Sequence, residues 1–475
     1  MTAPHGRPLL HLAAEIGGRQ AYDAGPHVEA ARLAESGRLD FVTLDDSFAR
    51  PGPDALAVLS RAAPATHRVG LVPTVTTTHT EPFQVQAAVA TLDWLSRGRA
   101  GWRIEVSPTE GEARLFGRRH AATAEELWQE AAEVAEAAER LWDSWEEEST
   151  GSRGPAERRS RDDRPPGDGP SCDGPPDDRP PGDGPSCDGP PGGRLAGDRL
   201  PGDRPGDERS AGGGRAGGRP AVGDRVAGDR LSGDDRSGDG FHGHPAGDGP
   251  SGDRPADGRT AGDRSGDVHS VGDRNIGGER LHHVDFTGGT FSVRGSSAVP
   301  RPPQGHPVRV VDATEGHARA TAARYADVVL VRAASPAQAA AVRDRLRSAA
   351  AGFGRDPDTL RVLASLVIDL GDGEYAAERG HGGGGPRPSD RGPLYRGGPV
   401  DLAELIAAWH RAGAVDGFHL VPTAPHRDLE RLVNGTVALL QHRGLFRTFY
   451  PGSTLREHLG LPRPASRYAR TGGAA

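Results

Sequence analysis

The polar residues best placed for chemistry gather where strand-like segments end. Five threonines and one histidine occupy the stretch 74–80, at the end of a strand predicted over 69–75. Packing does not require so many hydroxyl groups, whereas hydroxyl and imidazole groups can hydrogen-bond a ligand. The alternative role for this stretch is a hydroxyl-rich turn that caps the following helix.

A second strand, predicted over 41–44, ends in two adjacent acids, Asp45 and Asp46. Neighbouring residues of a strand face opposite sides, so the two carboxylates cannot form an acid/base pair on one face. We expect one to point inward, where it could accept a hydrogen bond from a ligand. The other should face the loop and cap the next helix.

A third strand, predicted over 100–106, carries Arg103 and Glu105 two positions apart, which places them on one face. Opposite charges inside a fold predict a polar pocket. The alternative is that the two side chains face the helix layer and pair there. Trp102 then lies on the other face and belongs to the core.

Two isolated histidines complete the set: His11, expected near the end of the first strand, and His419, near the end of the last. A lone histidine in such a strand is more often a hydrogen-bonded core residue than a base. No His and acid residues have metal-ligand spacing, and no G-x-S-x-G motif is present. No catalytic residue or metal site is therefore assigned, and polar strand ends without a nucleophile suit a cofactor that supplies its own chemistry.

These residues must be positioned by an α/β fold, because strand-like and helix-like patterns alternate along the chain. Eight strand–helix pairs predict a closed (β/α)8 TIM-like barrel with its reactive groups at the carboxyl ends of the strands. No G-x-G-x-x-G follows the first strand, which disfavours an open dinucleotide-binding sheet. The expected pairs are 9–14 with 26–36, 41–44 with 54–63, 69–75 with 83–95, 100–106 with 124–145, 308–311 with 315–325, 328–331 with 336–351, 360–370 with 402–412, and 417–421 with 429–443.

A long Gly/Asp/Arg/Pro segment, 151–275, interrupts this pattern between the fourth and fifth β/α units. The chain holds 69 Gly and 41 Pro and only 35% hydrophobic residues, and nearly all of that imbalance falls in this segment. It cannot bury enough apolar surface to offset its ordering entropy, so we expect a disordered insert. The domain plan is therefore 1–150 as the first half of the barrel, 151–275 as the insert, and 276–475 as the second half with a carboxyl-terminal extension.

The remaining features narrow the function classes. The formal net charge is −8 and the arginines form no basic stripe, so no nucleic-acid partner is expected. No apolar run is long enough to span a bilayer, and no signal segment precedes the first strand, which predicts a cytoplasmic protein with no membrane association.

A second Gly/Pro-rich stretch, 380–399, should form a loop on the catalytic face, either as a mobile lid or as an expanded loop.

Several motifs, in order along the chain, resemble the luciferase-like flavin-dependent monooxygenases, within them the branch of nitrilotriacetate and dibenzothiophene-sulfone monooxygenases. The similarity covers essentially everything outside 151–275. The motifs are G-L-V-P-T-V-T-T-T-H-T-E-P-F (70–83), T-L-D-W-L-S-R-G-R-A-G-W (91–102), L-W-D-S-W-E (141–146), H-H-V-D-F-T-G (282–288), P-R-P-P-Q-G (300–305), D-G-F-H-L-V-P (416–422), R-G-L-F-R-T-F-Y (443–450) and T-L-R-E-H-L-G-L-P-R-P (454–464).

The resemblance implies a TIM-like barrel that binds reduced FMN, supplied by a separate flavin reductase, or in some relatives a deazaflavin. By position, Asp46 matches the acid after strand two, Thr76 a hydroxyl near the flavin ring, and Ser107 a hydroxyl at the end of strand four. Arg103 stands where the branch usually has Asn. Glu315 replaces a Ser in the phosphate-binding turn, where a carboxylate at a helix N-terminus would compete with the phosphate.

The function expected from the sequence is a flavin-dependent monooxygenase or oxidoreductase that acts on a small organic substrate with reduced flavin and O2. Two alternatives stay open: a deazaflavin-dependent oxidoreductase, and a catalytically inactive barrel homologue, which Glu315 favours. Relatives are commonly homo-oligomers, so we expect a homo-oligomer here.

Overall fold

The computed structural model describes residues 6–17, 22–146, 274–276, 279–371 and 385–469. The chain separates into two compact units, Met1–Gly154 with Asp267–Ala475, and Pro155–Gly266. The second unit lies wholly outside the described residues, so the fold below is that of the first. The expected disordered insert, 151–275, also lies outside them, except for its last two residues, which begin strand β5.

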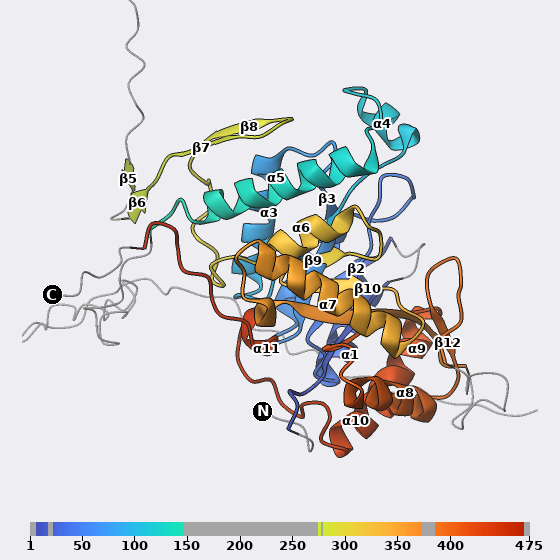
Figure 1. Ribbon diagram of the computed structural model, residues 1–475. Helices are drawn as coiled ribbons and strands as arrows, with labels where there is room; N and C mark the ends of the chain where they lie inside the picture. Colours follow the sequence, from blue (N-terminus) through green and yellow to red (C-terminus); the bar gives the residue numbers. More distant parts are fainter. Residues whose placement is uncertain (1–5, 18–21, 147–273, 277–278, 372–384, 470–475) are drawn as a thin grey trace, which may run out of the picture. The chain divides into compact units, whose positions relative to one another are not determined.

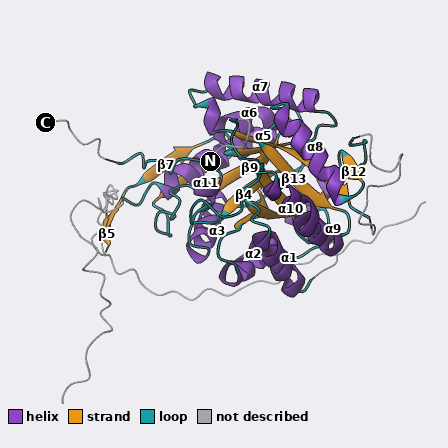
Figure 2. Ribbon diagram, turned by 90° about the horizontal axis from the view of Figure 1, so that it is seen from below, coloured by secondary structure: helices purple, strands orange, loops and turns teal. Residues whose placement is uncertain are grey.

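Eight parallel strands close into a barrel (Figures 1 and 2). Each pairs with the next along the chain, and the last pairs back with the first, where His11 lies opposite Gly417. The predicted (β/α)8 barrel, with the insertion between its fourth and fifth units, is confirmed. The barrel strands are β1 (His11–Glu15), β2 (Phe41–Leu44), β3 (Gly70–Thr76), β4 (Gly101–Glu105), β9 (Val308–Asp312), β10 (Val328–Val331), β11 (Arg361–Asp369) and β13 (Gly417–Pro422).

Helices surround the barrel on its outside (Figure 2). The start of one was read correctly from sequence, since Ser335 accepts a hydrogen bond from the Gln338 amide and Pro336 occupies the first turn. The outer helices are α1 (Ala24–Ser36), α2 (Ala55–Ala62), α3 (Pro82–Leu95), α5 (Ala124–Trp142), α6 (Ala318–Tyr325), α7 (Pro336–Gly352), α8 (Pro399–Arg411) and α9 (Pro425–Arg431), which continues through the π-helical turn Leu432–Val437 into α10 (Ala438–His442).

Several short elements were not predicted. Helix α4 (Glu110–Phe116) is seven residues long, too short for a clear apolar period, and begins with a capping box between Thr109 and Glu112. The others are the 3-10 turns Ala63–Ala65 and Pro357–Thr359, the strand β12 (Leu394–Arg396) beside β11, the hairpins β5 (Arg274–Ile276) with β6 (Glu279–Leu281) and β7 (Val284–Thr287) with β8 (Ser292–Gly295), and the helix α11 (Leu455–His458).

The barrel interior is apolar only toward the amino-terminal ends of its strands. Side chains such as Phe41, Val72 and Val308 pack together there with Leu455 and Leu459 from the carboxyl-terminal segment. This apolar plug, formed by these side chains with Leu455 and Leu459, closes the amino-terminal end of the barrel. The polar side chains of the interior lie at the carboxyl-terminal end. Strands β1 and β13 approach each other closely where the barrel closes. A Cβ at Gly417 would lie only 1.9 Å from the carbonyl oxygen of His11, so this position requires glycine.

A buried carboxylate joins the two stretches of chain that flank the long insertion. Asp143 follows α5, just before the insertion, and its Oδ1 accepts from Arg301 Nε at 3.1 Å and from His306 Nε2 at 3.0 Å. Burial would raise the pKa of Asp143, but His306 and Arg301 outweigh that effect and hold it below its ordinary value. The ionised carboxylate therefore fixes the segment that leads into β9.

Among the described residues, no helix combines the length and apolar character needed to cross a membrane.

Replacing Asp143 by Ala should lower the free energy of unfolding by about 3–5 kcal/mol, because it leaves the buried guanidinium of Arg301 without a compensating carboxylate. Since the carboxyl group has a lowered pKa in the fold, its contribution is complete above pH 4 and fades as the pH falls further. Urea unfolding at pH 7.5 and at pH 3.5 measures both effects. The control is Asp285→Ala, which removes an exposed ion pair to Arg294 and should cost less than about 1 kcal/mol. Equal losses in the two variants would show that Asp143 does not anchor the fold.

Candidate active site

The carboxyl-terminal end of the barrel is centred on a buried arginine. Parallel pairing places Arg103 beside Thr74 of β3 and Val310 of β9, and Arg103 is only 6% exposed. The prediction that Arg103 and Glu105 form a polar interior is confirmed, and the alternative of pairing against the helix layer is wrong. Trp102 faces the opposite side and is fully buried among the outer helices, as expected.

The guanidinium of Arg103 is surrounded by carboxylates but makes no hydrogen bond to any described residue. Its nitrogens lie 3.9 Å from Glu15, 3.8 Å from Asp45 and 3.8 Å from Glu105, and Nε is buried without a partner. Burial would lower the pKa of Arg103, but the carboxylates more than offset this and raise it. The barrel therefore holds a permanent cation whose donors are unfilled.

The surrounding acids are short of compensating charge. Burial raises the pKa of both Glu15 and Glu105, and Arg103 only partly opposes it. Two other arginines lie closer to these acids than Arg103 does: Arg391 is 3.5 Å from Glu15, and Arg50 is 2.6 Å from Asp45. Arg391 belongs to the loop after β11, so the described part of that Gly/Pro-rich loop reaches the mouth, as predicted.

The threonine-rich stretch joins the ends of β3 and β4. Thr76 Oγ1 lies 3.0 Å from Ser107 Oγ, and Thr78 Oγ1 accepts from the Ser107 amide at 3.1 Å. The N-cap of α3 is Glu81, with no capping side-chain bond, so the alternative of a helix-capping turn is wrong. Thr74 Oγ1 is buried without a hydrogen-bond partner, which leaves a hydroxyl available to a ligand.

The two adjacent acids face opposite ways, as the strand geometry required. Asp45 points inward toward Arg103, whereas Asp46 Oδ2 accepts from the Ala55 amide at 3.0 Å at the start of α2. Burial raises the pKa of Asp46 above its ordinary value.

Two neighbouring cavities open at this end of the barrel and share Asp46 and Ser47. One of about 230 Å³ is also lined by Phe48, Leu56, Thr74, Val75, Thr76, Thr80, Gln84 and Val85. The other, of about 380 Å³, is also lined by Glu15, Gly17, His27, Asp45, Arg50 and Arg391. The first has apolar walls with hydroxyl groups, and the second is strongly charged.

His79, the histidine of the threonine-rich stretch, is a candidate functional residue. Its backbone φ is +66°, which is rare for a residue other than glycine and recurs at functional sites. Both ring nitrogens are buried without a hydrogen-bond partner, and the ring stacks on Phe116 of α4 at 4.8 Å. Phe116 also meets Phe48 edge-on at 4.8 Å, so the unpredicted helix α4 brings an aromatic cover to the mouth.

Glu315 is not where the sequence placed it. Helix α6 begins at Ala318, so the expectation of a helix starting at Glu315 is wrong. The reason is local: Asp312 Oδ1 accepts from the amide and hydroxyl of Thr314 and holds 312–314 as a turn. The Glu315 side chain is exposed, lines neither mouth cavity, and makes no hydrogen bond or ion pair to Asp46, Thr76, Arg103 or Ser107.

The two isolated histidines have different positions. His419 is the third residue of β13, fully buried, with its ring nitrogens 2.8 Å from Thr43 Oγ1 and 3.1 Å from Ser365 Oγ. Burial lowers its pKa to about 3, so it is a neutral core residue. His11 is the first residue of β1, so the expectation that it lies near the carboxyl end of that strand is wrong; it contacts Asp40 at the opposite end of the barrel.

Comparisons with known proteins agree with this architecture. The profile of the luciferase-like monooxygenase family matches residues 9–176 and 277–434, about two thirds of the chain. An N-acetyl-S-(2-succino)cysteine monooxygenase of Bacillus subtilis is 24% identical, with 93% of this chain and 91% of that protein covered. The nitrilotriacetate monooxygenase component A of Aminobacter aminovorans is 25% identical, with 95% and 93% covered.

Solved structures show the same fold. The EDTA monooxygenase of Chelativorans sp. BNC1 superposes with a TM-score of 0.62 at 18% identity, covering 96% of this chain and 99% of that one. Together with the parallel barrel and its polar carboxyl-terminal mouth, the family match shows that this chain belongs to the luciferase-like monooxygenase family.

Proposed function

We propose that this luciferase-like monooxygenase binds reduced FMN at the carboxyl-terminal mouth of its barrel and uses it with O2 to oxygenate a small organic molecule. The observation that carries the proposal is the buried guanidinium of Arg103, which makes no hydrogen bond to any described residue. Such a group is costly unless something else occupies its donors. The relatives named above are monooxygenases of small organic compounds, which supports the same substrate class here.

The residues at the mouth fit a flavin. Its pyrimidine ring presents carbonyl oxygens and ring nitrogens that accept hydrogen bonds, and Arg103 and Thr74 offer donors without partners. The apolar walls of the smaller cavity, including Phe48, Leu56 and Val75, suit a flat aromatic ring. Arg103 would hold the polar edge of the ring, with the Thr76 and Ser107 hydroxyl pair and Asp46 beside it.

When bound, reduced flavin supplies the electrons with which O2 is activated. The chain's own side chains then have three tasks. Arg103 keeps a fixed positive charge beside the ring, where negative charge is best stabilised. The rings of Phe48, Phe116 and His79, which pack against one another, cover the mouth and limit the access of water. The neutral form of His79 is favoured because burial lowers its pKa, so an acceptor nitrogen stays available to a substrate proton.

The phosphate of FMN would lie at the turn between Asp312 and α6. The His317 N-cap makes no side-chain capping bond, and Arg319 follows in the first turn of the helix. The amide groups at a helix start bind phosphate well. Glu315 opposes this, but its exposure to solvent screens the repulsion.

We also infer that a separate flavin reductase supplies the reduced flavin. The nitrilotriacetate relative is named as component A, which supports a two-component system.

Thr76→Val should weaken FMN binding several-fold without changing the melting temperature by more than a few degrees. The variant keeps the side-chain volume and removes one hydroxyl, whose hydrogen bonds are each worth about 0.5–1.5 kcal/mol. FMN fluorescence quenching measures the affinity. The matched control is Thr91→Val on the exposed face of α3, which should bind FMN like the wild type. If the two variants bind FMN equally, Thr76 does not contact the cofactor.

Glu315→Ser should tighten FMN binding by about threefold to tenfold, because it removes a screened negative charge near the phosphate. Titrations at low and at 0.5 M salt should show a smaller gain at high salt. Asp285→Ser, which removes an equal charge from the β7–β8 hairpin, serves as the control. The phosphate lies elsewhere if Glu315→Ser and the control give the same affinity.

A further inference from the structure

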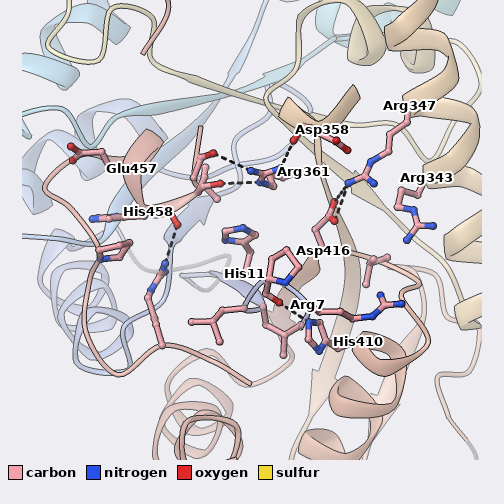
Figure 3. A pocket seen from close by; sticks show the side chains of 18 residues that line it. Arg7, His11, Arg343, Arg347, Asp358, Arg361, His410, Asp416, Glu457 and His458 are labelled. Carbon is pink, nitrogen blue, oxygen red and sulfur yellow. Dashed lines mark hydrogen bonds and ion pairs between the residues drawn. The ribbon is translucent and has the colours of Figure 1, made fainter. Parts of the chain in front are cut away.

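A second large cavity, of about 610 Å³, lies at the amino-terminal ends of the barrel strands, opposite the mouth (Figure 3). It is bounded by the starts of β1 and β11, by α7 and by the carboxyl-terminal segment 447–460. The apolar plug of the barrel interior, with Leu455 and Leu459, separates this end from the mouth. The cavity is therefore distinct from the proposed flavin site.

Basic side chains dominate the lining: five arginines and three histidines face three acids. Three of the arginines are matched by carboxylates. These pairs are Arg347 with Asp416 at 3.0 Å, Arg447 with Asp40 at 2.9 Å, and Arg343 with Asp344 at 2.8 Å.

The other two arginines have no carboxylate within 4.0 Å among the described residues. Arg361 donates only to main-chain oxygens: to that of Leu459 at 2.9 Å, to that of Gly460 at 3.1 Å, and to that of Asp358. Arg7 is exposed, packs over Gly413, and makes neither a hydrogen bond nor an ion pair within the described part of the chain.

The acids do not cancel these two charges. The carboxylate of Glu457 is turned to the start of α11, where it accepts from the amides of Ser453 and Thr454. The carboxylate of the exposed Asp358 likewise has no arginine partner among the described residues, and solvent screens its charge. Two unmatched guanidinium groups therefore face one solvent-screened carboxylate, and the cavity favours an anion.

His11 is held in place at this cavity. In the view of Figure 3 its imidazole lies between Arg361 and His410. Its Nδ1 is 2.9 Å from Asp40 Oδ1, and Asp40 also accepts from the Leu12 amide at 2.7 Å. Burial would raise the pKa of Asp40, but Arg447 and His11 outweigh it and hold the pKa below its ordinary value. The ionised carboxylate fixes the ring through Nδ1, which leaves Nε2 for a ligand.

His458 lines the cavity and carries a buried ring nitrogen without a hydrogen-bond partner among the described residues. The residue is 3% exposed, and its Nε2 lies 3.1 Å from the Gly452 carbonyl oxygen, to which it donates. Burial lowers its pKa to about 4, so the ring is neutral and Nδ1 is an acceptor. No described residue satisfies that Nδ1. A buried acceptor without a partner is rare in folded proteins and calls for a donor.

We propose that this cavity binds a small organic anion, with a carboxylate or phosphate group recognised by Arg7 and Arg361 and a hydroxyl or amide donor recognised by His458. The apolar body of the ligand would contact Pro8, Leu10 and Val415, which also line the cavity. Cationic groups above an apolar floor suit an oxyanion attached to a hydrophobic group.

The test uses the full-length protein, with calorimetric titration of benzoate, phenyl phosphate and the neutral analogue benzyl alcohol. We expect saturable binding of one or both anions, and binding of benzyl alcohol at least tenfold weaker. The anion that binds more tightly identifies the preferred oxyanion. No saturable binding of either anion at millimolar concentration, or equal binding of benzyl alcohol, would overturn the proposal.

Arg7→Glu locates the site, because this exposed side chain has no partner whose loss would unfold the protein. It should weaken anion binding about fivefold or more. Arg345→Glu reverses an equally exposed charge on α7 outside the cavity and should bind within twofold of the wild type. Equal weakening in the two variants would show a general charge effect and contradict the assignment. Displacement of the bound anion by FMN would place it at the mouth instead and would equally overturn it.

Discussion

The rest of the structure depends on one constraint: after the long insertion, the chain must come back to pair β9 with β4. A parallel barrel closes only if β9 pairs with β4 in the correct register, and β9 is separated from β4 by some two hundred residues. The buried carboxylate of Asp143 fixes this return, since it holds Arg301 and His306 immediately before β9. Asp93 of α3 and Gln304 add a second buried contact at 2.6 Å, which holds the same segment before β9. The contacts that hold the segment before β9 are thus made by described residues on either side of the insertion.

Closure in this register divides the interior into two chemically different ends. Apolar side chains and the carboxyl-terminal plug fill the amino-terminal half, and Arg103 with its surrounding carboxylates occupies the other. Removing charges from water is unfavourable unless close partners compensate. Here the carboxylates lie nearly 4 Å from Arg103 and accept no hydrogen bond from it, so they compensate its burial only in part. A fold that keeps a buried guanidinium under these conditions is prepared for a ligand with acceptor groups, which is what a flavin offers.

Much of this could be predicted from the sequence, for identifiable reasons. Apolar strands such as 308–311 and 328–331 are long enough to be recognised, and the alternation of strand residues placed Arg103 inside, Trp102 outside and Asp45 opposite Asp46. The contacts that depend on distant segments could not be predicted. The stacking of His79 on Phe116 requires a seven-residue helix without a periodic pattern, and the strained backbone of His79 leaves no mark in the sequence. The helix predicted to start at Glu315 begins only at Ala318, because Asp312 holds the preceding residues in a local turn. The spacing of apolar residues gives no sign of that turn.

The most direct test of the account is the affinity of the protein for FMN in the wild type and in Arg103→Gln. Fluorescence quenching gives both affinities, and circular dichroism with thermal melting establishes that both proteins are folded. The account predicts saturable FMN binding in the wild type and at least a tenfold weaker affinity in Arg103→Gln, because the polar edge of the flavin loses its charged donor. Equal affinity in the two folded proteins, or no binding of FMN by the wild type, would contradict it.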